Sequence, residues 1–141
     1  MYCEVVEANW QDTKTVMKAI RSAVFIDEQK VPEALEWDDQ DELARHFIAI
    51  DMEGQPVGTV RLLPSGQISR LSVLQPFRSQ GVGKTLLSFV ELMARTAGMD
   101  EVFLHAQTHA TSFYEAAGFT PTGGIFLEAD IPHRQMFKEL K

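Results

Sequence analysis

Residues 78–84, which read RSQGVGK, place two glycines between apolar patterns of different period. Before them, residues 68–74 alternate as a strand does, and after them residues 86–97 have the apolar spacing of a helix. A loop that leaves a strand and opens a helix directs backbone N–H groups outward, and glycine lets a ligand approach that backbone closely. The segment therefore predicts an anion site, and we expect the anion to be a pyrophosphate.

Two other phosphate-binding motifs share part of this segment and do not fit it. Gly83, Lys84 and Thr85 match the end of a Walker A loop, but its first glycine would fall at Arg78. The third glycine of a dinucleotide-binding fingerprint would fall at Leu86, inside the predicted helix. The remaining pattern is R-x-x-G-x-G.

That pattern and the downstream segment FYEAAGF (residues 113–119) together resemble the GNAT superfamily of N-acetyltransferases. The closing residues 131–136 are similar to those of its small ElaA-like bacterial branch. The resemblance runs from about Phe47 to the end of the chain. It implies an α/β (α+β) GNAT fold, in which about four helices flank a mixed, mostly antiparallel twisted sheet of six to seven strands. It also implies transfer of an acetyl group from acetyl-coenzyme A to a primary amine, by direct attack in a ternary complex.

The resemblance assigns roles to particular residues. The hydroxyl of Tyr114 is expected to protonate the departing thiolate as a general acid. Main-chain groups of one strand would face the pantetheine arm, namely those of Leu71, Ser72 and Val73. The pyrophosphate would be held by the backbone of the glycine loop and by the charges of Arg78 and Lys84; the loop residues are Arg78, Ser79, Gln80, Gly81, Val82, Gly83 and Lys84.

The general base is less defined. An alkylammonium of pKa ~10.4 must lose a proton before it attacks, which costs about 4.6 kcal/mol at pH 7. His109 lies five residues before Tyr114 and is our candidate, since imidazole accepts protons near neutral pH. The alternatives are ordered water and carboxylates of an acidic stretch, namely Glu28, Asp39, Asp41 and Glu42. His133, Arg134 and Arg61 could bind an acidic group of the substrate, and His105 is expected in the core.

The acidic stretch lies between Asp27 and Glu42, where eight carboxylates accompany the single base Lys30. Such a cluster can attract a cationic amine, but a solvated polar face is the more frequent explanation of a charge run. The net charge of −7 argues against a nucleic-acid partner. We expect a small-molecule or peptide amine as acceptor, and a homodimer is possible.

Composition fits one domain over residues 1–141, with 45% hydrophobic residues and no linker. The single cysteine, Cys3, excludes an internal disulfide, and the four scattered histidines suggest no metal site. Without an apolar run of membrane-spanning length or a signal-like N-terminus, the protein is predicted to be cytoplasmic.

Apolar spacing and turn residues predict the elements. Strands are expected at residues 2–8, 46–52, 56–63, 66–74 and 101–106, with one or two more after Phe119. Helices are expected after a cap at Asp12 or Thr13, at residues 82–97 and at 110–117.

Two other functions remain open. The chain could be a non-catalytic sensor of coenzyme A, because binding a cofactor does not establish turnover. Residues 21–25 (RSAVF) followed by Trp37 and acidic residues are also similar to the N-terminal half of acyl-homoserine-lactone synthases, although those are longer and mainly use acyl carrier protein.

Overall fold

The computed structural model describes residues 2–141, which form seven strands and four α-helices. A π-helical turn, η1 (Ser22–Glu28), continues α1, and two short 3₁₀ turns precede α3 and α4. In chain order the main elements are β1 (Cys3–Ala8), α1 (Trp10–Arg21), α2 (Glu33–Glu36), β2 (Arg45–Asp51), β3 (Pro56–Leu62), β4 (Ile68–Val73), α3 (Val82–Thr96), β5 (Glu101–Gln107), α4 (Thr111–Ala116), β6 (Thr120–Glu128) and β7 (Ile131–Glu139).

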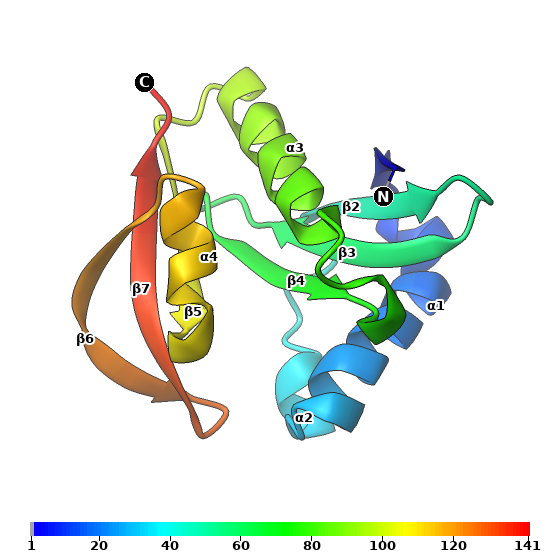
Figure 1. Ribbon diagram of the computed structural model, residues 1–141, viewed down its shortest axis with the longest axis horizontal. Helices are drawn as coiled ribbons and strands as arrows, with labels where there is room; N and C mark the ends of the chain where they lie inside the picture. The colour runs from blue at the N-terminus through cyan, green and yellow to red at the C-terminus, as the bar shows by residue number, and fades with distance from the viewer. Residues whose placement is uncertain (1) are drawn as a thin grey trace.

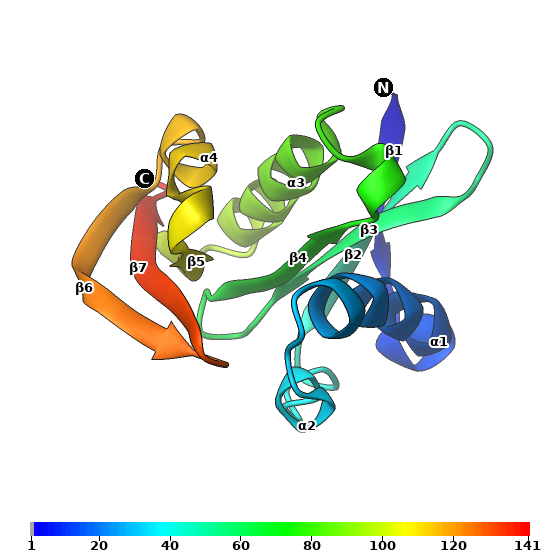
Figure 2. The ribbon, with the colours of Figure 1, turned by 60° about the horizontal axis from the view of Figure 1, so that its bottom comes forward.

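The strands form two antiparallel sheets, one in the order β1-β2-β3-β4 and the other in the order β5-β7-β6. A single parallel bridge between Gln67 and Phe103 joins them at the start of β4. Figure 1 shows the two sheets side by side, and Figure 2 shows α3 on one side of the four-stranded sheet and α1 with α2 on the other. The predicted fold class is confirmed, with the difference that the sheet is divided between β4 and β5.

The main core lies between α3 and the sheets. Helix α3 buries Leu86, Val90 and Ala94, which share one face because they are four residues apart. Gly58 on β3 permits this close packing, since a Cβ there would lie 2.9 Å from the carbonyl oxygen of Ser72 and 3.0 Å from Leu86 Cδ1. Cys3 is half-buried on β1, as expected for a strand residue.

The predicted cap of α1, at Asp12 or Thr13, was wrong by three or four residues. Asn9 caps this helix, because its side-chain Oδ1 accepts a hydrogen bond from the N–H of Asp12 at 3.3 Å. Trp10 therefore falls in the first turn, where it is buried against β2. Other element boundaries differ from the prediction by one or two residues, as at β4, which begins at Ile68 rather than Gly66.

None of the helices within residues 2–141 is long and apolar enough to cross a bilayer.

Candidate active site

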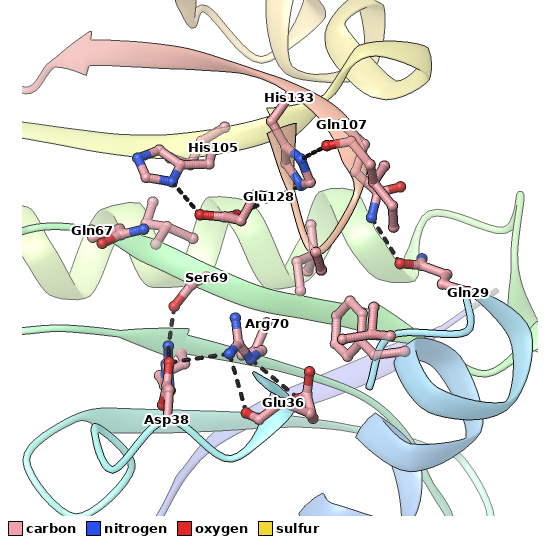
Figure 3. A pocket seen from close by; sticks show the side chains of 18 of the residues that line it. Gln29, Glu36, Asp38, Gln67, Ser69, Arg70, His105, Gln107, Glu128 and His133 are labelled. Carbon is pink, nitrogen blue, oxygen red and sulfur yellow. Dashed lines mark hydrogen bonds and ion pairs between the residues drawn. The ribbon is translucent and has the colours of Figure 1, made fainter. Parts of the chain in front are cut away.

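A cavity of about 520 Å³ opens where the two sheets diverge (Figure 3). One wall comes from β3, β4 and the segment around α2, and includes Arg61, Arg70 and Glu36. The other wall comes from β5 and the β6–β7 hairpin, and includes His105 and His133. Tyr114 of α4 and His109 of the preceding 3₁₀ turn also line it. The cavity thus collects residues from nearly the whole length of the chain.

A β-bulge shapes the first wall. Thr59 pairs with Ser72 and Arg61 pairs with Ser69, so β4 carries one more residue than β3 between these pairs. Arg70 takes up the extra residue with a φ of 56°, in the left-handed region that non-glycine residues rarely adopt. As a result Ser69, Arg70 and the following leucine all line the cavity, which a regular alternating strand would not allow.

Three arginines and three carboxylates form a network behind this wall. Arg21, which is 1% exposed, donates to Glu36 Oε2 at 2.8 Å and to Asp41 Oδ1 at 2.7 Å. Arg61 donates from both Nη atoms to the carboxylate of Asp38 at 2.8 and 2.9 Å. Arg70 adds a bond to Asp38 at 3.1 Å and an ion pair with Glu36 at 3.2 Å that lacks hydrogen-bond geometry.

This network corrects the interpretation of the acidic stretch as a solvated face for three of its eight acids, while the other five are exposed. Glu36 and Asp41 are buried, and their charges are balanced by arginines that lie far away in the sequence. Arg61 likewise engages internal carboxylates and Ser69 Oγ, so it does not present a free guanidinium to a substrate. The arginines that pair with these three acids come from α1, β3 and β4, so they do not appear within the acidic stretch of the sequence.

The pKa values of the two acids in the wall move in opposite directions. Burial raises the pKa of Glu36 despite the neighbouring arginines. Burial also opposes ionisation of Asp38, but hydrogen bonding and charge from Arg61, with charge from Arg70, outweigh it and lower the pKa of Asp38 to about 2. Asp38 is therefore a very weak base at neutral pH.

The glycine loop lies between the end of β4 and α3. Ser79 and Gly81 have φ values of 61° and 91°, and no side chain within the described residues caps α3. The first N–H groups of a helix have no intrahelical acceptor, and they carry a partial positive charge. The backbone is open at Gly81, where a Cβ would meet no atom within 4 Å, and the side chain of the following Val82 is buried. The loop thus fits a pyrophosphate.

The guanidinium of Arg78, the first residue of this loop, is already hydrogen-bonded within the protein. Its Nε donates to the carbonyl of Val73 at 2.8 Å, and its two Nη atoms donate to the carboxylate of Glu28 at 2.7 Å each. The bidentate pair joins η1 to the loop across the end of β4. An anion at the loop would compete with Glu28 for this side chain.

The sequence pattern of the acetyltransferase (GNAT) domain family matches residues 9–140. The chain belongs to this family. It is 36% identical over 124 residues to the uncharacterized N-acetyltransferase YjcF of Bacillus subtilis, covering 85% of this chain and 88% of that one. It is 31% identical over 129 residues to ElaA of Escherichia coli, covering 86% and 84%.

Solved structures agree with this assignment. The crystal structure of Escherichia coli ElaA matches with a TM-score of 0.86 and 29% identity over 96% of this chain and 99% of that one. An acyl-CoA N-acyltransferase from Pseudomonas aeruginosa matches with a TM-score of 0.85 and 29% identity over 97% and 99%. Both resemblances drawn from the sequence, to the GNAT superfamily and to its ElaA-like branch, are confirmed, and the protein is an acyltransferase.

Three of the predicted cofactor residues lie on the edge strand β4. Apart from the bridge at Gln67, β4 pairs only with β3 in residues 2–141, so the other edge of β4 is open toward β5. Leu71 and Val73 lie along this strand, directly before the glycine loop. The side chain of Ser72 is buried against Thr59 Oγ1 at 2.8 Å, so Ser72 has only its main chain to offer a ligand.

Tyr114 and His109 line the same cavity from α4 and from the 3₁₀ turn that precedes it. The ring of Tyr114 packs edge-on against Phe113 and Phe119, and its hydroxyl has no hydrogen-bond partner among residues 2–141. Burial raises the pKa of Tyr114 to about 12, so the phenol keeps its proton at neutral pH and can donate it. His109 is exposed at the rim of the cavity.

The other base candidates are less suitably placed. Asp41 is buried in the arginine network, and Glu28 is paired with Arg78. Asp39 and Glu42 are exposed and lie outside the cavity.

Sequence reasoning missed a cluster on the second wall, made of His105, Glu128 and His133. His105 Nδ1 lies 3.0 Å from Glu128 Oε1, and His133 Nε2 lies 3.7 Å from Glu128 Oε2 (Figure 3). His105 was expected in the core, but it is half-buried in the cavity. In residues 2–141 no group of three or more potential ligands is arranged to hold a metal ion.

Proposed function

We propose that the protein is an acetyl-coenzyme A dependent N-acetyltransferase that transfers its acetyl group to a primary amine by direct attack in a ternary complex. One observation carries this proposal: the edge of β4 that is open toward β5 borders the cavity that Tyr114 lines, and the glycine loop with the N-terminus of α3 follows directly on that strand. The family match supports acyl transfer, and the cavity supports a small acceptor or the end of a peptide.

The residues around the open edge would divide the binding of the cofactor. The N–H groups of residues 79–84 would hold the pyrophosphate, aided by the charges of Arg78 and Lys84. The main chain of residues 71–73 would pair with the pantetheine arm, as an edge strand pairs with an added strand. When bound, acetyl-coenzyme A supplies the thioester whose acyl group is transferred.

Tyr114 would supply the proton that the departing sulfur needs. In the overall balance an ammonium loses two protons: one ends on the sulfur of coenzyme A and one is released to solvent. The C–N bond forms as the C–S bond breaks, and the hydroxyl of Tyr114 protonates the thiolate. The phenolate then regains a proton from the nitrogen of the new amide. A cytoplasmic location, a single domain over the whole chain and a homodimer stay predictions.

Calorimetric titration with acetyl-coenzyme A, followed by thiol release with a panel of primary amines, tests the proposal. We expect binding and acceptor-dependent thiol release. Tyr114→Phe should lower kcat by about 10²-fold or more and leave the affinity for acetyl-coenzyme A unchanged. Binding without turnover on any amine would favour the sensor function. Turnover only with an acylated carrier protein and S-adenosylmethionine would favour an acyl-homoserine-lactone synthase.

A further inference from the structure

The second wall of the cavity holds side chains that can accept a proton and are not paired with arginines, whereas the carboxylates of the first wall are. His105 and Gln135 face each other across the β5–β7 ladder, and Gln107 faces His133, so the two histidines are diagonal neighbours on one face. Phe126 pairs with His133 on the β6–β7 ladder, and Glu128 pairs with Ile131. The three residues therefore project from one face of the same sheet.

Glu128 is placed by a tight hairpin. The two residues between β6 and β7, Ala129 and Asp130, both have positive φ values, 51° and 61°. This is the geometry of a type I′ turn, which usually requires glycine or asparagine. An alanine in the left-handed region is strained, and such strain often accompanies a functional position. The turn directs Glu128 back over the sheet toward the two imidazoles (Figure 3).

The hydrogen bonds fix which nitrogen of His133 is free. His133 Nδ1 lies 2.7 Å from the carbonyl oxygen of Ile131, and a carbonyl only accepts, so Nδ1 must carry a proton. In the neutral ring Nε2 then holds a lone pair, and it faces Glu128 Oε2 at 3.7 Å. The imidazole is 8% exposed and stacks on Phe126, which holds the ring in this orientation.

Two acceptors at this separation suit an ammonium ion. A nitrogen about 2.9 Å from each, the usual hydrogen-bond length, can donate one proton to Nε2 and another to the carboxylate. His105 Nδ1 donates to the remaining oxygen, Oε1, and keeps the carboxylate in place. We propose that His133 Nε2 is the general base of the acetyl transfer, that Glu128 binds the acceptor ammonium, and that His105 is a positioning residue.

The step is balanced. The ammonium gives one proton to His133 Nε2, and the free amine attacks the thioester carbonyl carbon. Glu128 stabilises the imidazolium that forms, as a carboxylate does in other histidine-based sites. The imidazolium then releases its proton to solvent. The other charged and titratable groups that share the cavity are Tyr114 and, at the rim, His109. On the opposite wall they are Glu36, Asp38, Arg61 and Arg70, which are paired among themselves.

This inference rests on the proposed function, and a pH series tests both. The probe is the amine that gives the fastest thiol release in a panel of lysine, spermidine, glucosamine and a peptide with a free N-terminus. For His133→Gln we expect a loss of 10²- to 10⁴-fold in kcat/KM at pH 7. The loss should shrink about tenfold for each pH unit toward the pKa of the amine used, which is ~10.4 for a lysine side chain and about 8 for a peptide N-terminus, because the variant reacts only with free amine. The affinity for acetyl-coenzyme A should not change.

Companion variants separate the roles. Glu128→Gln should mainly raise KM for the amine, and His105→Asn should have a smaller effect that His105→Gln partly restores. Glu101→Gln, which changes an exposed acid on β5 outside the cavity, should behave as wild type.

A pH-dependent loss in His109→Gln with full activity in His133→Gln would overturn the proposal. So would a loss in His133→Gln that is equal at every pH and is accompanied by weaker cofactor binding, since that indicates a structural role. A wild-type protein inactive on every amine would instead refute the proposed function and remove the basis of this inference.

Discussion

Replacement of Asp38 by asparagine tests whether the arginine network stabilises the first wall of the active site. The carboxylate of Asp38 accepts two hydrogen bonds from Arg61 and one from Arg70. Asparagine keeps the size and one acceptor oxygen but removes the charge. Arg61, which is 2% exposed, would then keep only Asp41 as an ionic partner within residues 2–141, and Asp41 also pairs with Arg21.

The size of the effect follows from the pKa of Asp38, which is lowered from its ordinary value of 3.8 to about 2. At about 1.36 kcal/mol per pKa unit, the charged form is favoured in the folded state by about 2.4 kcal/mol. Because the side chain is 30% exposed, solvent screening reduces this, and we expect a loss of about 1–2 kcal/mol in the free energy of unfolding at pH 7.

Urea unfolding between pH 7 and pH 2 measures this loss. A lowered pKa in the folded state means that the stabilisation is complete above about pH 4 and is lost as the pH falls toward 2. Wild type and Asp38→Asn should therefore differ at pH 7 and converge near pH 2. Asp39→Asn is the matched control, because Asp39 is exposed and has a φ of 63° that asparagine tolerates. A difference that is the same at both pH values, or one shared by Asp39→Asn, would refute the reasoning.

Two glycine substitutions give further predictions. Gly58→Ala should lower the free energy of unfolding by about 2 kcal/mol in urea unfolding, because the new methyl meets a backbone oxygen at 2.9 Å; an unchanged midpoint would contradict this. Gly81→Ala and Gly54→Ala should each cost about 1 kcal/mol of stability, since both positions have positive φ. Only Gly81→Ala should also weaken binding of acetyl-coenzyme A in calorimetry, and equal affinities for the two variants would argue against the loop as its site.

Local patterns were sufficient to predict the elements that position the cofactor loop. Helix α3 was found because its apolar residues recur every three and four positions and Gly98 ends them. The strands before and after it alternate clearly, so their ends were predicted within about two residues. The cap of α1 was misplaced because Asn9, Asp12 and Thr13 are all good capping residues, and only the hydrogen bond to Asn9 distinguishes them.

The charged parts of the site could not be predicted in this way, because their partners are distant in sequence. Arg21 and Glu36 are 15 residues apart, and Arg61 and Asp38 are 23 apart. A run of acidic residues in a sequence does not indicate whether arginines from other elements will pair with it in the folded protein. The second wall was missed for a similar reason: His105 and Glu128 are 23 residues apart, and only the strand register brings them together.

The two walls of the cavity have different consequences for the acceptor. On and behind the first wall three arginines pair with three carboxylates, so the network presents little negative charge to the cavity. Within residues 2–141, Glu128 on the second wall has only imidazoles as partners, and it is 50% exposed. The charge that an incoming acceptor meets therefore comes mainly from Glu128, and it favours a cation. The acids of the acidic stretch that belong to this wall are thus balanced by arginines, and inside the cavity the preference for a cation rests on a single carboxylate outside that stretch.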